Sequence, residues 1–532
     1  MPKKPNFLVI IVDEERYPTK YETEELKLWK KKNLKFQTKF AKKSTVFHNH
    51  YTNTTACCPA RATLHTGQYP LVHSVTQTYG IAKNADDPDM YWLDKFTAPT
   101  MANYFKEHGY CTKIKGKWHI SDSEIKFKNG QTMNTYDNEG NRIPVLEDIY
   151  LKQNPLNDYG FTSSWIGPEP HGKDPLNSAS SAPKPATSRD QSFMEQVINE
   201  LDQLNNIDQP WFLISSMVNP HDVTLYGLYT DNSSSGFEFD IDPTIPKKMF
   251  TDEFKKSLNE TLDTKPAAQK AYRDLYSKAV QPIINIEKYH RFYYTLQKKV
   301  DEKIYKIWKK LKSLDSYDNT IVMFVSDHGD LQASHGKMFQ KWHNAYQETI
   351  HVPLMIGSPL FGNKHNDIHE LTSHIDILPT LLGFAHADIE HLRNELLKTF
   401  SLALPLPGRN LSKLVTHNCK IEHKPYYFYT EDEPFKGQNQ INMLCQPYDA
   451  VPQPCHVQAL IAKHNSHLWK ITNYYGCDCS SNCPNGGITG ELYNLNVDYM
   501  ELNNLYGKKE YQDVQNYLNE LMKKYSFLYR GK

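Results

Sequence analysis

Three short runs of apolar residues predict strands that are buried on both faces of a sheet. They cover residues 6–12, 211–217 and 320–326, and each is followed by polar residues. Uninterrupted β-branched and apolar runs of this length are typical of central parallel strands. Open α/β sheets bind their ligands at the carboxyl ends of such strands. The pattern therefore predicts a site near Asp13, His221 and Asp327.

Segments with helical periodicity lie between these strands. Residues 190–204 and 286–314 repeat apolar positions at intervals of three and four, as amphipathic helices do. This order predicts an α/β/α sandwich around a mostly parallel sheet. Residues 126–189 are rich in Asn, Pro, Ser and Gly and weak in periodicity, which predicts irregular surface that shapes the mouth of a site.

The pattern changes in the last quarter of the chain. Residues 425–430, 459–462 and 467–472 resemble short strands of an antiparallel sheet, and residues 511–528 resemble a closing helix. We therefore expect a smaller C-terminal α+β domain. With a boundary near residue 415, the predicted domains are residues 1–415, which would be catalytic, and residues 416–532.

The charge balance narrows the classes of partner. The 532 residues include 61 basic and 61 acidic side chains, so the net charge is zero and binding to nucleic acid or to an anionic membrane is disfavoured. No run approaches the roughly 18 apolar residues of a membrane-spanning helix. The apolar residues 7–12 are also too short for the core of a signal peptide. We expect a soluble chain without a conventional secretion signal, cytoplasmic by default.

Residues 57–61 carry the most informative motif. They read Cys-Cys-Pro-Ala-Arg, and residues 66–70 continue with Thr-Gly-Gln-Tyr-Pro. Taken alone, the segment is equally a Cys-rich turn entering a helix. It resembles the signature Cys-x-Pro-Ser/Ala-Arg of the sulfatase family, in which the first Cys is oxidised to formylglycine. The resemblance places Cys57 at the modified position and Arg61 at the arginine of the motif.

Further segments extend the resemblance along the chain. Residues 109–119 are similar to the family's Gly-Tyr-x-Thr-x-x-x-Gly-Lys-Trp-His, and residues 326–329 to its metal-binding Asp-Asn/His-Gly. Residues 340–354 and 491–505 resemble the family's Lys-containing segment and its C-terminal ending. The resemblance runs from Asn6 to about Leu505. The chain is identified as a sulfatase-like member of the alkaline phosphatase superfamily.

The chemistry of sulfuryl transfer can be compared with the residues present. The reaction requires negative oxygens to be neutralised, so carboxylates that hold a divalent cation should lie beside basic side chains. Asp13 and Asp327 are hard oxygen ligands suited to Ca²⁺ or Mg²⁺, and His328 would also tolerate Mn²⁺ or Zn²⁺. The resemblance implies that formylglycine at Cys57 completes the metal shell. We expect one divalent cation, with Ca²⁺ favoured.

The resemblance also implies roles for other polar residues. Arg61 would hold the hydrated aldehyde, and the groups that bind the sulfate oxygens and assist proton transfer would be Lys117, His119, His221 and Lys341. His335 is a further candidate, either supporting a ligand from behind or only shaping its loop.

Several positions depart from the family pattern. Glu14 stands where the family usually has a second Asp, and we leave it outside the predicted metal ligands. The pair Asp327-His328 resembles choline sulfatases and phosphonate monoester hydrolases, which leaves the substrate class open. Ala60 is an accepted variant of the motif, and His351 occupies a position where Arg is common.

The C-terminal cysteines match no strong zinc motif. Cys477, Cys479 and Cys483 would need a fourth ligand, for which Cys445, Cys455 and His456 are available. A loop with free or paired thiols is the favoured interpretation.

These observations predict a hydrolase of small-molecule or glycan sulfate esters that depends on a formylglycine-generating or equivalent maturation enzyme. One alternative is a phosphonate or phosphate ester hydrolase that uses the same site. The other is a catalytically silent binding protein in which Cys57 is never oxidised.

Overall fold

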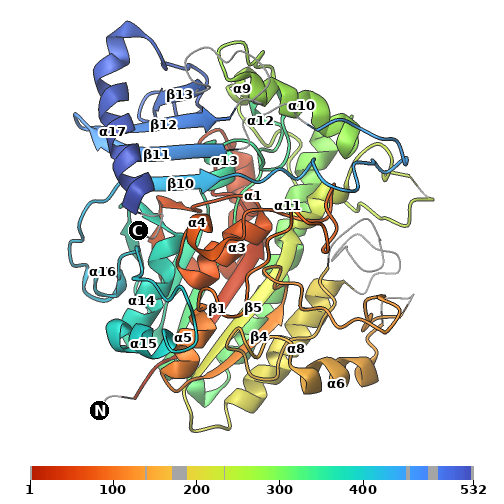
Figure 1. Ribbon diagram of the computed structural model, residues 1–532, viewed down its shortest axis with the longest axis vertical. Helices are drawn as coiled ribbons and strands as arrows, with labels where there is room; N and C mark the ends of the chain where they lie inside the picture. The colour runs from red at the N-terminus through yellow and green to blue at the C-terminus, as the bar shows by residue number, and fades with distance from the viewer. Residues whose placement is uncertain are drawn as a thin grey trace.

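A mixed sheet runs through the centre of the molecule (Figure 1). The computed structural model describes residues 3–137, 141–170, 188–232, 234–450, 456–476 and 489–528. Within these residues the sheet comprises, in order, β4 (Cys111–Gly116), β5 (Trp211–Pro220), β1 (Asn6–Asp13), β6 (Thr320–Ser326), β7 (Leu354–Gly357), β2 (Thr45–Phe47) and β8 (Asn366–Ile368). The three strands predicted from apolar runs, β1, β5 and β6, are neighbours and pair in parallel, so their carboxyl ends share one edge.

The two faces of β1 pack against different layers of helices. Leu8, Ile10 and Val12 lie in one core with α2 (Lys35–Ala41), α8 (Arg189–Leu204) and α11 (Ile286–Leu311). Residues 7, 9 and 11 lie in a second core with α3 (Cys57–Thr66), α5 (Met101–Glu107) and α14 (Ile377–Phe384). Because successive side chains of a strand point to opposite faces, one apolar run serves both cores. The predicted α/β/α sandwich is confirmed.

Local signals explain where the long helices begin. The side chain of Ser188 accepts a hydrogen bond from the backbone N–H of Gln191 at the start of α8, and Asn285 caps α11 in the same way. The predicted helices 190–204 and 286–314 therefore agree with α8 and α11 within a few residues. The expectation of irregular structure over residues 126–189 was wrong for α6 (Pro144–Gln153), which starts with a proline in its first turn.

The C-terminal part forms a second, antiparallel sheet (Figure 1, upper left). Its strands are β10 (Tyr426–Thr430), β11 (His456–His464), β12 (His467–Tyr475) and β13 (Thr489–Asn494). One face packs against α17 (Gln512–Leu528), and the other joins a large aromatic core that it shares with the N-terminal part of the chain. The predicted antiparallel sheet and closing helix are confirmed. The domain boundary near residue 415 stays a prediction.

Shorter elements complete the described structure. The helices are α1 (Glu24–Asn33), α4 (Pro70–His73), α9 (Phe254–Leu258), α10 (Ala267–Ala279), α12 (Ser334–Lys337), α13 (Gln347–Ile350), α15 (Ile389–Leu396) and α16 (Ser412–His417). The 3-10 helices are η1 (His221–Leu225), η2 (Asp315–Asn319), η3 (Pro359–Phe361), η4 (His374–Asp376) and η6 (Lys509–Tyr511). A two-stranded parallel sheet consists of β3 (His50–Tyr51) and β9 (Thr372–Ser373). Among the described helices, none combines the length and the apolar character needed to cross a membrane.

Candidate active site

The ends of β1 and β6 bring two buried carboxylates together. Asp13 is the last residue of β1, and Asp327 follows directly after β6. Both side chains are fully buried. The backbone N–H of Glu14 donates to Asp327 Oδ1 at 3.1 Å, which ties the two strand ends to each other. Parallel pairing of the two apolar strands is therefore what creates this pair of acids.

Helix α3 begins at Cys57 and points that residue at the two acids. Cys57 Sγ lies 3.1 Å from His328 Nε2 and 3.6 Å from Asp13 Oδ1. Burial, with a contribution from the Asp13 carboxylate, raises the pKa of Cys57 to about 11. Cys58 instead packs in the apolar core beneath α3. The Cys-rich segment is thus a helix start that presents one of its two cysteines to the polar site.

Arg61, one turn after Cys57, links the two carboxylates. Its Nη2 donates to Asp13 Oδ2 at 2.9 Å, and its Nε lies 2.9 Å from Asp327 Oδ2. Its Nη1 also donates to the Ser216 hydroxyl at 2.9 Å. The planar guanidinium suits such multiple contacts, so Arg61 fixes the position of both acids.

The four residues predicted to bind a metal lie close together. The ligand atoms of Asp13, Cys57, Asp327 and His328 all lie within 4.8 Å of one another, and all four residues are buried. Nδ1 of His328 is 3.0 Å from the carbonyl oxygen of Gly329, which can only accept, so Nδ1 carries the proton and Nε2 is left as a ligand. Two carboxylates and an imidazole with a free lone pair fit a divalent cation.

Two buried lysines from distant segments flank the acids. Lys117 Nζ donates to Asp13 Oδ2 at 2.7 Å, and Lys341 Nζ donates to Glu14 Oε2 at 2.8 Å. Burial opposes ionisation of Asp13, but the surrounding positive groups, with Lys117 the largest contributor and Arg61 among the others, together hold the pKa of Asp13 well below its usual range. Burial likewise opposes the charge on Lys117, and the Asp13 carboxylate raises its pKa. The site therefore contains fixed charges of both signs.

His119 and His221 are also brought to this site. His221 opens η1 at the end of β5, is half-buried, and places Nε2 4.0 Å from Glu14 Oε2. Burial, reinforced by Lys117, lowers the pKa of His221 well below its usual value. His119 has a left-handed backbone, and its N–H donates to Glu169 Oε1 at 2.8 Å. Its ring meets that of Tyr79 edge-on at 5.0 Å.

Three further residues contact the site: Glu14, which the sequence analysis left outside the metal ligands, and Glu169 and Ser216, which it did not find. Glu14 forms a second group of possible ligands with Asp13 and His221, but its carboxylate is bound by Lys341. Glu169 orients the Lys117–His119 segment through two backbone N–H groups, and Ser216 binds Arg61. Of these three residues, only Glu14 could be recognised as a site residue from the sequence, because it follows Asp13 directly. The other two belong to no motif and meet their partners only in the folded chain.

His335 belongs to a different buried cluster. Its Nδ1 lies 3.1 Å from Glu260 Oε2 and its Nε2 lies 3.3 Å from Glu348 Oε2. Its ring stacks on Tyr346 at 3.8 Å. These contacts support the interpretation that His335 shapes its loop. Cys455, Cys477, Cys479 and Cys483 lie outside the described residues, and Cys445 is exposed with a free thiol.

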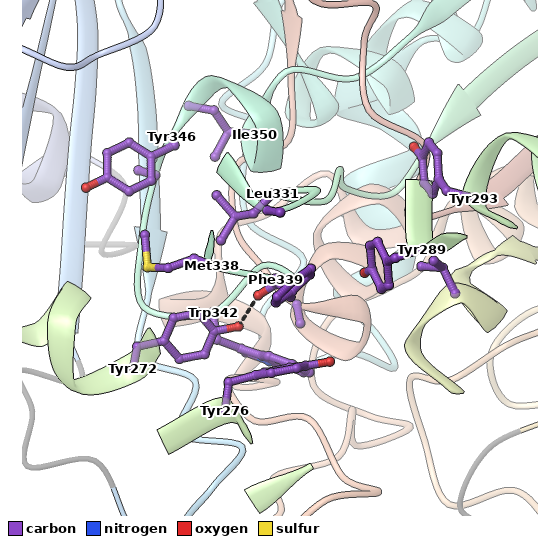
Figure 2. Packing of buried hydrophobic residues seen from close by; sticks show 14 of the residues in the cluster. Tyr272, Tyr276, Tyr289, Tyr293, Leu331, Met338, Phe339, Trp342, Tyr346 and Ile350 are labelled. Atoms are coloured by element: carbon purple, nitrogen blue, oxygen red, sulfur yellow. Dashed lines mark hydrogen bonds between the residues drawn. The ribbon is translucent and has the colours of Figure 1, made fainter. Parts of the chain in front are cut away.

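The loop that carries Lys341 is held on several sides. Figure 2 shows the aromatic residues around it, including the hydrogen bond from the Tyr272 hydroxyl to the carbonyl oxygen of Phe339. Trp342 Nε1 donates to Asp432 Oδ2 at 3.2 Å. The Tyr346 hydroxyl donates to Glu491 of the C-terminal sheet at 2.7 Å. Residues 338–346, called the Lys341 loop below, thus depend on both parts of the molecule.

A pocket opens above these groups. Cys57, Lys117, His119, His221 and Lys341 all line it. Its outer walls come from the segment after α4, from η1 and from the end of α10. Reactive and charged groups at the base of a mostly apolar pocket are typical of an active site.

Comparison with known proteins agrees with this geometry. The Sulfatase family model matches residues 5–387, a range that contains every site residue from Asp13 to Lys341. The choline-sulfatase of Rhizobium meliloti (strain 1021) is 26% identical over 411 residues, which cover 73% of this chain and 69% of that protein. Arylsulfatase K of Canis lupus familiaris is 24% identical over 487 residues, covering 87% and 72%. The solved structure of a 2-O GAG sulfatase has a TM-score of 0.64 at 19% identity, covers 99% of this chain and 93% of that one, and shares the fold.

Proposed function

Because the chain belongs to the sulfatase family, we propose that it hydrolyses sulfate esters with a formylglycine formed from Cys57 and one divalent cation. One observation carries the proposal. The ligand atoms of Asp13, Cys57, Asp327 and His328 converge at the base of a pocket that Lys117 and Lys341 also line. This arrangement offers a place for a cation beside the singly charged sulfate group of an ester.

Asp13, Asp327 and His328 would hold the cation, together with the modified residue 57. When bound, the cation supplies positive charge that polarises the sulfate and stabilises the charge developing on its oxygens. Ca²⁺ is favoured because both carboxylates are hard oxygen donors. Mg²⁺, Mn²⁺ and Zn²⁺ are the alternative cations to compare in the activity assay. Arg61 would fix the orientation of both carboxylates as well as hold the aldehyde.

The unmodified Cys57 would be a poor nucleophile in this site. With a pKa of about 11, the thiol is protonated near neutral pH and is a weak nucleophile. A maturation enzyme that converts it to formylglycine would therefore be a required partner. A chain in which Cys57 is unmodified would bind the substrate without hydrolysing it.

The remaining residues of the site would act on the sulfate and the departing alcohol. Lys117 and Lys341 would bind sulfate oxygens as compact positive charges. His119 and His221, which also line the pocket, would complete this binding and assist proton transfer.

The proposal is tested by producing the chain with a formylglycine-generating enzyme and comparing it with Cys57→Ala. We expect the matured protein to hydrolyse aryl sulfate, and EDTA to abolish the rate until a divalent cation is restored. Cys57→Ala should show no turnover. The assay panel should include choline sulfate, a sugar sulfate and a phosphonate monoester.

Two outcomes would contradict the proposal. Faster hydrolysis of the phosphonate monoester than of every sulfate would assign the site to phosphonate chemistry. No hydrolysis at all, with formylglycine at position 57 verified by mass spectrometry and the cation bound, would favour the silent binding protein.

A further inference from the structure

The chain after β10 passes behind the pocket and joins segments that are far apart in the sequence. β10 ends at Thr430, and Asp432, two residues further on, is only 2% exposed. The Thr430 hydroxyl donates to the carbonyl oxygen of Thr55 at 2.6 Å and accepts from the backbone N–H of Asp432 at 3.4 Å. The end of β10 is thus tied to the chain directly before α3.

Three N–H groups converge on the Asp432 carboxylate. Its Oδ2 accepts from the backbone N–H of Ala56 at 3.4 Å and from Trp342 Nε1 at 3.2 Å. Its Oδ1 accepts from the backbone N–H of Thr78 at 2.9 Å. Thr78 and Trp342 line the pocket, so this carboxylate supports two of its walls from behind.

Two of the donors adjoin residues that carry the proposed chemistry. Ala56 is the N-cap residue of α3, whose first residue is Cys57, and an alanine side chain cannot cap that helix start itself. Trp342 follows Lys341 directly. One carboxylate therefore holds both the chain before the proposed nucleophile and the chain after the proposed sulfate-binding lysine.

The contacts require a carboxylate rather than any polar group of the same shape. Burial raises the pKa of Asp432 to about 6, against the opposing effect of Lys83, so the group is ionised at pH 8. An ionised carboxylate accepts through both oxygens, whereas an amide presents one acceptor and one donor end. In Asp432→Asn, either Thr78 or the pair Ala56 and Trp342 would therefore face another donor.

We propose, on the basis of the proposed function, that Asp432 is a positioning residue that fixes the modified residue 57 and Lys341 relative to each other. It acts through Ala56 and Trp342 and touches neither the sulfate nor the cation. A displacement of reacting groups by about 1 Å can lower a rate by roughly 10²-fold. Because the groups that bind the substrate stay in place, the loss falls on kcat and not on KM.

Kinetics of the matured, metal-loaded protein test this role at pH 8 and at temperatures where each variant is fully folded. Asp432→Asn should lower kcat by about 10- to 100-fold and change KM by less than about three-fold. The matched control is Asp301→Asn. Asp301 is also buried and accepts one backbone N–H on each oxygen, from Phe36 at 2.8 Å and from Gln37 at 3.0 Å, but it joins α2 to α11. Its loss should lower stability to urea and leave kcat native.

A spectroscopic measurement reports on the Trp342 contact without turnover. In protein labelled with ¹⁵N-tryptophan, the indole N–H resonance of Trp342 is identified by its absence in Trp342→Phe. Loss of a hydrogen bond to a carboxylate should move the proton resonance upfield in Asp432→Asn. Asp432→Ala, which removes all three contacts, should move it as well, and Asp301→Asn should leave it in place.

Several results would overturn the inference. They are a native kcat in folded Asp432→Asn, a raised KM at native kcat, a kcat loss matched by Asp301→Asn, or an indole resonance that neither substitution of Asp432 moves. Each of them leaves hydrolysis by the native chain intact and so contradicts only the positioning role. No turnover of any sulfate by the matured native chain would instead contradict the proposed function, and the positioning role with it.

Discussion

The length of the Glu14 side chain determines that its carboxylate contacts Lys341. Its backbone N–H is fixed by Asp327 Oδ1, and its left-handed φ of 72° turns the chain after β1. From that position the longer side chain reaches Lys341, with 2.8 Å between Oε2 and Nζ. Glu14 is therefore better placed to orient an ammonium group than to bind a cation between Asp13 and Asp327.

Replacing Glu14 by Gln tests this role. The amide keeps the size of the side chain but replaces the carboxyl group that accepts from Lys341, so we expect kcat to fall by about 10- to 100-fold. Metal content, measured by mass spectrometry of the purified protein, and metal affinity should stay near those of the native chain. If Glu14→Gln instead loses the cation and regains a normal kcat at high metal concentration, Glu14 is a ligand.

The register of the modification is a second prediction for single residues. Cys57 Sγ faces His328, whereas Cys58 packs in the apolar core, so a maturation enzyme should leave its aldehyde at Cys57. Peptide mass spectrometry after co-expression should locate the loss of sulfur at residue 57. Cys58→Ala serves as the control and should still be modified, while an aldehyde found at residue 58 would contradict the assignment.

The sequence predicted the site residues that belong to motifs. It did not predict the residues that orient them through hydrogen bonds. Asp13, Cys57 and Asp327 were predicted from strand ends and a signature, and their ligand atoms do converge. Glu169 and Ser216 could not be predicted, because each hydrogen-bonds a site residue at least 50 positions away in the sequence. Such contacts exist only after the sheet has formed, and a single side chain carries no periodic signal of them.

At the scale of elements, the pairing of β4 with β5 positions two segments of the candidate site at once. The two strands are parallel, and the N–H of Lys117 donates to the carbonyl oxygen of Ser216 at 3.0 Å. Gly116 precedes Lys117 with a φ of 104°, and a Cβ atom there would lie 1.8 Å from that same carbonyl oxygen. Glycine is therefore required where the strand passes from the sheet into the site.

Gly116→Ala should accordingly harm both stability and activity. The overlap must force β4 away from β5, which we expect to cost about 2 kcal/mol or more in the free energy of unfolding. A displacement of Lys117 by about 1 Å would lower kcat by up to roughly 10²-fold. Urea unfolding and steady-state kinetics measure the two effects.

The control for this prediction is Gly130→Ala. Gly130 also has a positive φ, 83°, but nothing lies within 4 Å of a Cβ atom placed there. It should therefore show only the modest strain of the left-handed backbone and a normal kcat. Equal losses in both variants would mean that the backbone conformation, and not the close approach of β4 to Ser216, is what matters.

Elements with a strong pattern were predicted well, and those with a mixed pattern were not. The apolar runs of β1 and β6 match the structure closely, because central strands buried on both faces leave a continuous signal. β4 alternates polar and apolar residues, with lysines at positions 113 and 115, and was not predicted as a strand. Its place in the sheet is decided by pairing with β5, which the sequence of β4 alone does not reveal.

At the scale of the whole molecule, the C-terminal sheet forms part of the support of the active site. Phe428, Val457 and Tyr493 lie in the same aromatic core as Tyr272 and the Lys341 loop. Polar contacts reinforce this packing, since Lys470 Nζ donates to the carbonyl oxygen of Ala345 at 2.5 Å and forms an ion pair with Glu501. The carboxylate of Glu501 in turn accepts from the backbone N–H of Gln347 at 2.8 Å. The residues on the two sides of the predicted domain boundary at 415 therefore share one hydrophobic core.

Lys470→Met tests whether this distant sheet controls the chemistry. The substitution leaves Glu501 buried without its cation, and breaking such a pair from one side typically costs about 3–5 kcal/mol. Because the Ala345 carbonyl also loses its donor, the Lys341 loop should loosen, and kcat should fall at temperatures where the variant is fully folded. Lys523→Met, which removes a lysine 75% exposed in its pair with Glu520, should leave both the free energy of unfolding and kcat near those of the native chain. Urea unfolding and kinetics with an aryl sulfate measure both variants. A Lys470→Met protein with lowered stability but native kcat would show that the C-terminal sheet stabilises the fold without positioning Lys341.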